Sequence, residues 1–440
     1  MTQQEALQIM KLGNSVYLTG AAGSGKTYVL NQYIDYLRRN KVSMGITAST
    51  GIAATHINGM TIHSWSGIGI KDSLQGSDID ALLDKPHLRM RFLSTKVLII
   101  DEISMIHAYR LDMIDKVCRA FKYNDKPFGG LQVIMCGDFF QLPPVTRGSE
   151  DGSFVYKSEV WNSMDLKVCY LEEQHRQQDG PFLHVLQDIR NNDVTEDTMN
   201  YLASRFEQDI EGFDTPTKLY THNIDVDSIN QKHLQALNEV PHAHKMSSSG
   251  KADLVDILRK SCLAPENLVL KEGAAVMFVK NNFEAGYVNG TLGKVIGFSS
   301  QNYPIVKTFD GKTITATPDS WAVEVEGMVK AEITQVPLRL AWAITIHKSQ
   351  GMSLDAAEID LSKSFLPGMG YVALSRVRTL AGMKLVGFNN MALRVNEEVL
   401  EVDRQLKDLS TFSEDYLHDM TIGDINKQVE QFIKMNETKQ

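Results

Sequence analysis

A glycine-rich loop near the start of the chain has the residue types and spacing that bind phosphate. Residues 20–27 read GAAGSGKT and match the pattern G-x-x-x-x-G-K-[ST], between an apolar stretch and the start of a helical pattern. Glycines let backbone N–H groups point at phosphate oxygens, and the helix N-terminus adds a favourable dipole. We expect the lysine to reach the terminal phosphates of a nucleoside triphosphate and the threonine to bind Mg²⁺. The residues predicted to bind the nucleotide here are Gly23, Ser24, Gly25, Lys26 and Thr27.

Two carboxylates follow a second apolar stretch. VLII at 97–100 leads into Asp101 and Glu102, at the end of a predicted strand where open α/β sheets bind ligands. Alone, such a pair is equally typical of an exposed turn. Beside the phosphate loop, we expect Asp101 to hold Mg²⁺ through water and Glu102 to orient and deprotonate the attacking water.

A polar amide follows a third apolar stretch. QVIMC at 132–136 ends in GDFFQLPP, which places Gln141 just past a strand predicted to neighbour the carboxylate strand. Gln141 can sense the γ-phosphate of ATP. We interpret Phe139 as a core side chain, whereas the stiff turn with Pro143 can contact stacked bases.

Phosphoryl transfer also needs cationic side chains, which motor proteins commonly take from a second domain. Arg176 in LEEQHRQ and Arg376 after YVALS fit this role. A single arginine is more often a surface charge, so both assignments depend on the resemblance described below.

The elements that must position these residues alternate between short apolar and helical segments over the first 145 residues. This order predicts an α/β fold with a parallel sheet and helices on both faces. A second alternating region begins near Thr217, which predicts a second core of the same class. Residues 68–96 hold few periodic apolar positions and predict an inserted subdomain, and 263–333 contain short strands with Gly and Asn turns, typical of a small inserted β-barrel.

The end of the chain is acidic and helical in pattern. Ile425, Val429, Phe432 and Ile433 have helical spacing and predict a closing amphipathic helix. A solvated surface helix is the favoured reading of its acidity, ahead of a docking site for another protein. The predicted domains are 1–67 with 97–175 (first core), 68–96 (wedge subdomain), 176–262 with 334–393 (second core), 263–333 (barrel) and 394–440 (acidic helical tail).

Composition sets broad limits. No apolar run approaches the roughly 20 residues that span a bilayer, and no leader pattern is present, so we expect a cytosolic protein with no membrane partner. The net charge of −9 comes largely from the tail, and it does not exclude nucleic-acid binding, which needs only a local basic track. No C-x-x-C pair occurs, so we expect reduced, buried thiols at Cys118, Cys136, Cys169 and Cys262.

The motifs together resemble the petite-integration-frequency (PIF) family of superfamily 1 helicases. The resemblance extends from the first residues to Phe388. The stretches that carry it are TASTGIAA (47–54), TIHSWSGIG (61–69), DEISM (101–105), NDKPFGG (124–130), GDFFQLPPV (137–145), VNGTLGKVIGF (288–298, like the family's Src-homology-3-like barrel), TIHKSQG (345–351) and YVALSR (371–376).

This resemblance implies two RecA-like cores and ATP- and Mg²⁺-dependent movement along single-stranded DNA in the 5′-to-3′ direction. It implies unwinding of duplex DNA in replication, repair or recombination, and it extends the expected partners to G-quadruplex junctions and RNA–DNA hybrids. It also implies a monomeric core, in a bacterial or phage-infected cell. Residue by residue, the resemblance places Gln3 or Gln4 at adenine and Gly351 at the nucleotide. It places Ser104, Met105, Leu111 and Asp112 in an extra family signature. The residues that it places in the ATPase site are Lys26, Thr27, Asp101, Glu102, Gln141, Arg176 and Arg376.

Two departures from the family pattern stand out. Met369 occupies a position before YVALSR where the family usually has Gln, which removes an expected polar contact near Arg376. The chain also starts almost at the predicted adenine contact, so we expect a compact bacterial or phage form.

A nucleic-acid strand crossing both cores needs backbone contacts and stacking platforms that do not read sequence. Each candidate has a structural alternative: Trp65 as core, the histidines as structural hydrogen-bonders, and Asn289 as a hairpin turn. Arg89 and Arg91 either split the duplex or lie on a solvated face. The predicted contacts are Thr50, His63, Trp65, Pro143, Asn223, Asn289, His347 and Lys348.

Other functions remain open on the residues alone. A nucleotide-switched DNA-binding protein would need no catalytic carboxylate, so Glu102, Gln141 and the arginines argue against it. A motor on RNA is equally compatible with phosphate grip and stacking. A nuclease would need a further acidic or histidine cluster, which the sequence does not suggest.

Overall fold

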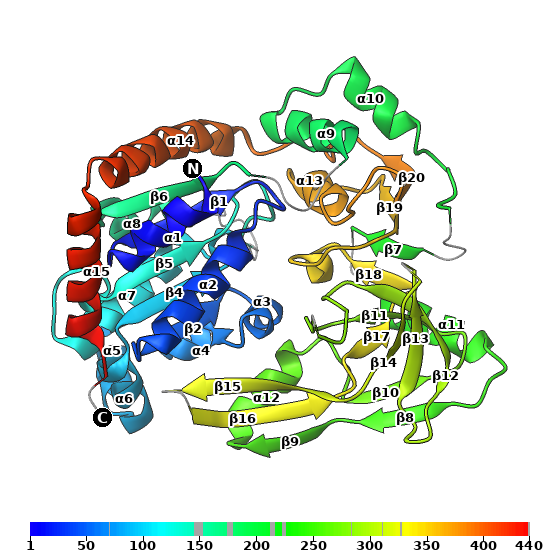
Figure 1. Cartoon of the computed structure of the whole chain (residues 1–440), viewed down its shortest axis with the longest axis horizontal. Helices are drawn as coiled ribbons and strands as arrows, with labels where there is room; N and C mark the ends of the chain where they lie inside the picture. The colour runs from blue at the N-terminus through cyan, green and yellow to red at the C-terminus, as the bar shows by residue number, and fades with distance from the viewer. Residues whose placement is uncertain are drawn as a thin grey trace.

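The computed structural model shows two α/β cores side by side, with a strand-rich insertion next to the second core (Figure 1). The structure describes residues 1–69, 71–144, 153–173, 179–211, 216–221, 226–282, 284–309, 311–325 and 328–438. Among these residues, no helix is both long and apolar enough to cross a membrane. All four cysteines are unpaired thiols; three are buried and Cys262 is partly buried, so the prediction of reduced, buried thiols holds for the first three.

The first core is built on a sheet of parallel strands, as predicted. Alternate residues of its strands face opposite sides: Val16 and Ile99 join one hydrophobic cluster, whereas Tyr17 joins another. A sheet buried on both faces requires continuous apolar runs, which VLII and QVIMC supply. The strand order is β3 (Met60–Thr61), β2 (Met44–Ala48), β4 (Val97–Asp101), β5 (Gln132–Cys136), β1 (Ser15–Gly20) and β6 (Leu166–Leu171).

Helices cover both faces of this sheet. Thr2 and Glu5 form a capping box that starts the first helix, beside the nucleotide loop. The helices of the first core are α1 (Gln3–Lys11), α2 (Lys26–Arg39), α3 (Gly51–His56), α4 (Ile62–Ser66), α7 (Ala108–Lys122) and α8 (Glu159–Ser163), with 3-10 turns η1 (Ile103–Met105), η2 (Pro127–Gly130) and η3 (Val155–Lys157).

The predicted wedge subdomain contains α5 (Gly76–Leu83) and α6 (Pro86–Ser94), and a small apolar face joins it to the first core. Phe92 is fully buried, with ring centroids 4.6 Å from Trp65 and 4.3 Å from Phe121. Leu88, one helical turn before Phe92, is also buried. The buried hydrophobic residues of this segment are Ile68, Leu82, Leu88 and Phe92, so the prediction of few core positions holds for its described residues, although Phe92 anchors the segment to the first core.

The second core has its own parallel sheet, in the order β18 (Ala343–Thr345), β7 (Thr217–Tyr220), β19 (Ala357–Leu361) and β20 (Met383–Phe388). This confirms the predicted α/β class. Its helices are α9 (Gly180–Asn191), α10 (Glu196–Ala203), α11 (Val226–Ala236) and α13 (Met369–Leu374), with η4 (His347–Ser349) after β18.

The strand-rich insertion is larger than the predicted range 263–333. Its strands begin at His242 and end at Leu340, because β8 pairs with β10, β9 with β16, and β11 with β17. These antiparallel partners are distant in sequence, so local patterns do not show them. The elements are β8 (His242–Lys245), β9 (Ser247–Gly250), α12 (Ala252–Ser261), β10 (Asn267–Leu270), β11 (Ala275–Phe278), β12 (Leu292–Phe298), β13 (Pro304–Thr308), β14 (Thr313–Thr315), β15 (Asp319–Val325), β16 (Met328–Gln335) and β17 (Leu338–Leu340).

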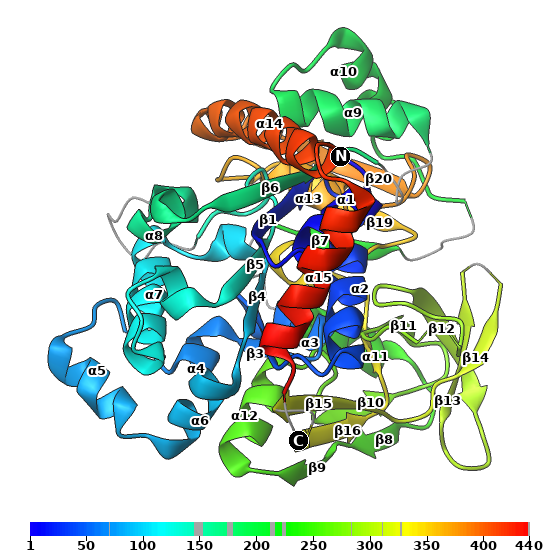
Figure 2. The same cartoon turned by 60° about the vertical axis from the view of Figure 1, so that its left-hand side comes forward.

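The C-terminal segment leaves the second core and returns to the first. Its helices are α14 (Glu397–His418) and α15 (Ile422–Asn436), and Figure 2 shows α15 lying across the first core. Leu417 and Phe432 are buried in the cluster formed by α1 and α2. The predicted closing amphipathic helix is therefore confirmed, and α15 packs on the first core.

Candidate functional site

The glycine-rich loop joins β1 to α2 and adopts a conformation that only glycine accommodates easily. Gly20, Gly23 and Gly25 have φ values of +141°, +90° and +87°. A Cβ atom at Gly20 would lie 2.5 Å from the carbonyl oxygen of Leu171. Because both flanking elements are present, the loop has the geometry of a phosphate cradle at a helix N-terminus.

Polar groups inside the loop are arranged as expected for a site that receives phosphate. Lys26 Nζ donates hydrogen bonds to the carbonyl oxygens of Gly20 (2.9 Å) and Ala21 (3.0 Å). Burial lowers the pKa of Lys26, and the nearby carboxylate of Asp138 opposes this shift. The buried hydroxyl of Ser24 has no hydrogen-bond partner among the described residues. Such a buried polar group calls for a ligand, and a phosphate oxygen would satisfy it.

The predicted carboxylates lie at the end of β4. Glu102 adopts a left-handed conformation (φ 52°, ψ 44°), which is uncommon outside glycine and occurs often at functional sites. Its backbone N–H donates to Asp101 Oδ1 at 2.9 Å, and Gln350 Nε2 of the second core donates to Glu102 Oε2 at 3.2 Å. Burial, followed by the charge of Asp101, raises the pKa of Glu102 to about 7. This value suits a general base near neutral pH.

A cavity of about 510 Å³ brings residues of both cores together at the loop. It is large enough for a nucleotide. The predicted residues that line it are Gly23, Gly25, Lys26, Thr27, Glu102, Gln141, Gly351 and Arg376. Ala22, Tyr28, Ser353 and Arg378 also line it and were not predicted.

Arg376 reaches this cavity from the end of α13 although it is almost completely buried, with 1% of its surface exposed. Its Nε donates to the carbonyl oxygen of Val372 (2.9 Å), and its Nη2 donates to Ser375 Oγ (2.8 Å). Burial lowers the pKa of Arg376, and Glu102 opposes this shift. Two hydrogen bonds thus fix the guanidinium at the edge of the phosphate site. The other predicted arginine, Arg176, lies outside the described residues.

The two N-terminal glutamines lie in different environments beside the loop. Gln3 is half-buried, and its Nε2 donates to the carbonyl oxygen of Ser24 at 3.1 Å. Gln4 is exposed, and both line a cavity of about 730 Å³ together with Tyr28. Of the two predicted adenine contacts, only Gln3 reaches the phosphate loop in this structure.

The oxygen ligands expected for Mg²⁺ face one space. Thr27 and Asp101 both line a cavity of about 430 Å³, with Glu102 beside them. A hydroxyl and a carboxylate fit Mg²⁺, which binds few protein oxygens and keeps several waters. Among the described residues, no cluster of three or more His, Cys, Asp and Glu side chains could hold a metal ion.

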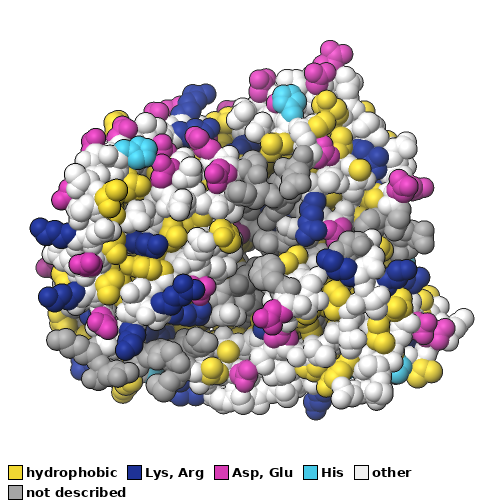
Figure 3. Space-filling model, viewed as in Figure 1, with side chains coloured by type: hydrophobic (Ala, Val, Ile, Leu, Met, Phe, Trp, Pro, Cys, Tyr) yellow, Lys and Arg dark blue, Asp and Glu magenta, His cyan; other side chains and the backbone are white. Residues whose placement is uncertain are grey.

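The same cavity gathers three of the predicted nucleic-acid contacts. Thr50 comes from the first core, Asn289 from the insertion and His347 from the second core. Thr50 also caps α3 by accepting a hydrogen bond from the N–H of Ala53 at 3.2 Å. Neither Asn223 nor the side chain of Lys348 lies within the described part of the chain. Figure 3 shows the described basic side chains scattered over the face of the molecule seen in Figure 1, without forming a single stripe.

The structure corrects the prediction for Trp65, and it places two other contacts away from this cavity. Trp65 is only 2% exposed and packs in the core, so its ring offers no face to a base. His63 is partly buried, and burial together with the charge of Arg110 lowers its pKa to about 4. Pro143 is half-buried at the end of its turn.

Arg89 and Arg91, considered for duplex splitting, have structural partners. Arg91 donates to the carbonyl oxygens of Ser64 (3.2 Å) and Trp65 (2.8 Å), where it closes the end of α4. Arg89 donates to the hydroxyl of Tyr123 at 3.2 Å and stays exposed. Arg91 therefore stabilises the first core, and only Arg89 faces solvent.

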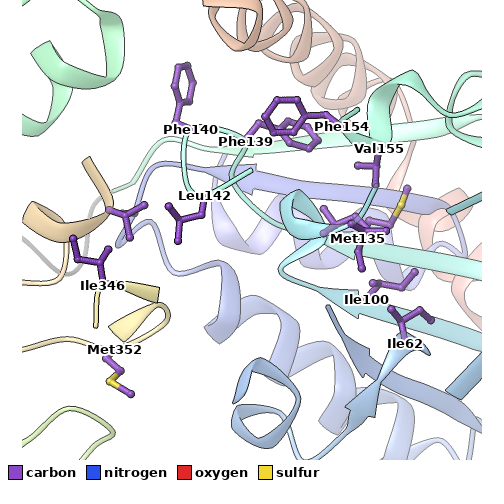
Figure 4. Close-up of a cluster of buried hydrophobic side chains, with 14 of the residues drawn as sticks. Ile62, Ile100, Met135, Phe139, Phe140, Leu142, Phe154, Val155, Ile346 and Met352 are labelled. Carbon is purple, nitrogen blue, oxygen red and sulfur yellow. The ribbon is translucent and has the colours of Figure 1, made fainter. Parts of the chain in front are cut away.

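The two phenylalanines after β5 have different roles. Figure 4 shows Phe139 close to Phe154 within the first core, whereas Phe140 points away from them and Leu142 lies toward Ile346. Phe139 also stacks on Tyr17 at 5.2 Å, which confirms the prediction that it is a core residue.

Four residues at or beside the site were given no role from the sequence: Gln350, Tyr371, Arg378 and Arg190. Gln350 and Tyr371 lie inside motifs quoted above, but no role was assigned to them. Arg378 follows Arg376 by two positions, and that pairing of arginines was the signal that could have revealed it. Arg190, which contacts Tyr371, lies in an ordinary helical pattern and could not have been found from sequence.

Comparison with known proteins agrees with this geometry. A family model described as PIF1-like helicase matches residues 3–199, and one for the 2B domain of DNA helicase Pif1 matches residues 253–298. A Psychrobacter protein named ATP-dependent DNA helicase Pif1 is 44% identical over 98% of this chain and 75% of its own length. The Xenopus laevis ATP-dependent DNA helicase PIF1 is 39% identical over 92% of this chain, which spans 64% of that protein.

Solved structures match over both cores and the insertion. The unliganded Pif1 from Bacteroides sp. has a TM-score of 0.79 and 34% identity, covering 92% of this chain and 96% of its own. Bacteroides Pif1 bound to single-stranded DNA covers the same shares at 33% identity, but its TM-score is 0.62. Over the whole chain, this structure is therefore more similar to the unliganded form than to the DNA-bound form. On its sequence, its fold and the geometry of its nucleotide site, the chain belongs to the PIF1-like helicase family.

Proposed function

We propose that this chain is an ATP-dependent DNA helicase that moves 5′-to-3′ along single-stranded DNA and unwinds duplex DNA. The observation that carries the proposal is the cavity shared by the two cores. Lys26, Glu102 and Gln141 line it from the first core, and Arg376 lines it from the second. A site completed by two cores links their relative position to hydrolysis, as a motor requires.

The chemistry follows from these side chains. Lys26 exchanges its two carbonyl partners for the terminal phosphates of ATP. Glu102 accepts the proton of the attacking water, and Arg376 stabilises the negative charge that develops on the transferred phosphoryl group. Gln350 of the second core donates to Glu102 Oε2, so the second core helps to orient the base.

Mg²⁺ held near Thr27 and Asp101 would neutralise charge between the β- and γ-phosphates. The two side chains supply oxygen ligands to the same cavity, one from the loop and one from the strand end. Their joint position supports Mg²⁺ as the cofactor of this site.

The expected track is single-stranded DNA, gripped near Thr50, Asn289 and His347. One solved relative is described as Bacteroides Pif1 bound to single-stranded DNA, and another as the structural basis for unwinding at forked duplex DNA by two coordinating Pif1 helicases, which supports these two substrates. G-quadruplex junctions, a monomeric core and a cytoplasmic place in a bacterial or phage-infected cell complete the proposal.

The test is unwinding of two partial duplexes, one with a 5′ single-stranded tail and one with a 3′ tail, together with ATP turnover with and without DNA. Unwinding of only the 5′-tailed duplex supports the proposal. Nucleotide-dependent DNA binding without unwinding would point to a switch protein instead.

Lys26→Ala should lower ATP turnover by about 100-fold or more, because a cation at the transferred phosphates is lost. DNA binding should be largely retained. Lys116→Ala, an exposed position on α7, is the matched control and should leave turnover unchanged. Unwinding that survives in Lys26→Ala would contradict the scheme.

A further inference from the structure

A buried arginine outside the predicted site connects three parts of the molecule. Arg190, near the end of α9, has only 7% of its side chain exposed. Its Nη1 donates to both carboxylate oxygens of Asp138 (2.8 and 3.0 Å) and to the hydroxyl of Tyr371 (3.1 Å). Its Nη2 donates to the hydroxyl of Tyr170 (3.1 Å) and to Asp403 Oδ1 (3.4 Å). A guanidinium suits this task, because its planar fork can serve several acceptors at once.

The charges around Arg190 are balanced. Asp138 is fully buried in the first core, and Asp403 on α14 also pairs with Lys407 at 2.8 Å. Burial by itself would raise the pKa of Asp138, but Arg190 and then Lys26 hold it below its usual range. The ring of Phe140 lies 4.1 Å from the guanidinium and covers it. Buried charges persist only when paired in this way, so these contacts fix the arginine in one position.

Two partners of Arg190 lead directly to the nucleotide. Asp138 accepts a hydrogen bond from Gln141 Nε2 at 3.3 Å, and Gln141 lines the ATP cavity. The hydroxyl of Tyr371 accepts a hydrogen bond from the backbone N–H of Ala22, inside the phosphate loop, at 3.0 Å. Arg190 therefore holds both the amide expected to sense the γ-phosphate and a tyrosine seated on the loop.

The other two partners of Arg190, Tyr170 and Asp403, lead away from the nucleotide to the C-terminal helix α14. Figures 1 and 2 show α14 lying beside β6, with one end next to α9. Tyr170 of β6 donates its hydroxyl to Asp403 at 2.9 Å, which ties this helix to the same cluster. The packing of α14 is thus connected to the phosphate loop through hydrogen-bonded side chains alone.

We propose that Arg190 is a positioning residue for ATP hydrolysis, which couples the C-terminal helix α14 and the second core to the phosphate-binding loop. This role rests on the proposed function. Arg190 does not touch the nucleotide: it acts through Gln141 and Tyr371, whose positions depend on it. Loss of Asp403 on α14 should then reach the ATP site, although that side chain lies outside the nucleotide cavity.

The test compares wild type with Arg190→Lys, Tyr371→Phe and Asp403→Asn in the full chain. Steady-state ATP turnover is measured at saturating single-stranded DNA, alongside thermal unfolding. We expect kcat to fall by about tenfold or more in Arg190→Lys and by roughly three- to tenfold in the other two, with KM for ATP changed less than about threefold. Arg404→Gln is the control, because Arg404 lies on the same helix, is 75% exposed and pairs only with Glu401 among its described partners.

Tyr371→Phe keeps the buried ring and removes only the hydroxyl, so it remains informative if Arg190→Lys does not fold. The double variant Tyr371→Phe with Asp403→Asn sharpens the test. If the two act through Arg190, the combined loss of kcat is smaller than the product of the single losses. Independent losses, or wild-type kcat in folded Tyr371→Phe and Asp403→Asn, overturn the role of Arg190. A wild-type protein without DNA-stimulated turnover overturns the proposed function, and this role with it.

Discussion

The nucleotide cavity and the predicted nucleic-acid face are built in different ways. Most predicted nucleotide residues lie on short, continuous motifs at strand ends, and the structure brings eight of them into one cavity. The predicted nucleic-acid contacts are single residues from three parts of the fold, and of those that the structure describes, Thr50, Asn289 and His347 share a cavity. Phosphate chemistry demands fixed backbone geometry, whereas a sequence-independent grip is assembled from dispersed side chains.

The largest expected effect lies on the nucleotide side. Glu102→Gln should lower kcat for ATP hydrolysis by about 100- to 1,000-fold, because the attacking water loses its base. ATP binding should persist, since the amide is nearly the same size and Lys26 is unchanged. Steady-state turnover and nucleotide titration measure the two effects separately. A variant that keeps more than a tenth of wild-type turnover would remove Glu102 from the role of base.

The next largest effect is expected at Trp65, which was predicted to contact nucleic acid but is buried in the core. Trp65→Ala should lower the free energy of unfolding by about 3–5 kcal/mol, because a large buried aromatic side chain is deleted. Denaturant unfolding measures this, with Tyr123→Ala as a control at an exposed aromatic position. If Trp65→Ala is as stable as wild type but binds single-stranded DNA poorly, the original prediction of a stacking contact is restored.

The pH dependence follows from the raised pKa of Glu102. Hydrolysis needs the ionised carboxylate, so kcat/KM for ATP should fall about tenfold per pH unit below pH 7. Stability changes in the opposite sense. A carboxyl with a pKa near 7 in the folded state and 4.5 when unfolded favours folding at low pH, and this contribution is lost as pH rises through 7.

The Glu102→Gln variant should consequently gain about 1–3 kcal/mol over wild type at pH 8, and little at pH 4. Thermal unfolding at both pH values checks the sign. An equal difference at the two pH values would show that the carboxylate is not the source.

The smallest expected effect lies on the nucleic-acid side. His347→Ala should raise the Kd for single-stranded DNA by about two- to tenfold, as expected for loss of one neutral hydrogen bond. KM for ATP should stay within twofold, and fluorescence anisotropy with a labelled oligonucleotide supplies the measurement. His233→Ala, on α11 and away from the cavity, serves as the control. A larger change in KM than in Kd would assign His347 to the nucleotide instead.

Several parts of the fold could be predicted because their signals are local. Four strands of the first sheet, β1, β2, β4 and β5, were placed within one residue, since each is a largely apolar run, whereas β3 and β6 were not predicted. The insertion was placed too narrowly, because β9 pairs with β16 across a long stretch of chain and its sequence, SSSG, has no strand pattern. The core role of Phe92 was missed for a similar reason: it depends on Trp65 and Phe121, which belong to other elements.

The sequence by itself determined the phosphate loop, the carboxylates at the end of β4 and the family. In each case, the chemistry requires particular residues at fixed, short spacing. Only the tertiary structure decided that Gln350 holds Glu102, that Trp65 is buried and that Tyr371 contacts Ala22, 349 positions away. Such contacts depend on how separate elements pack, and packing between distant segments leaves no periodic trace in either one.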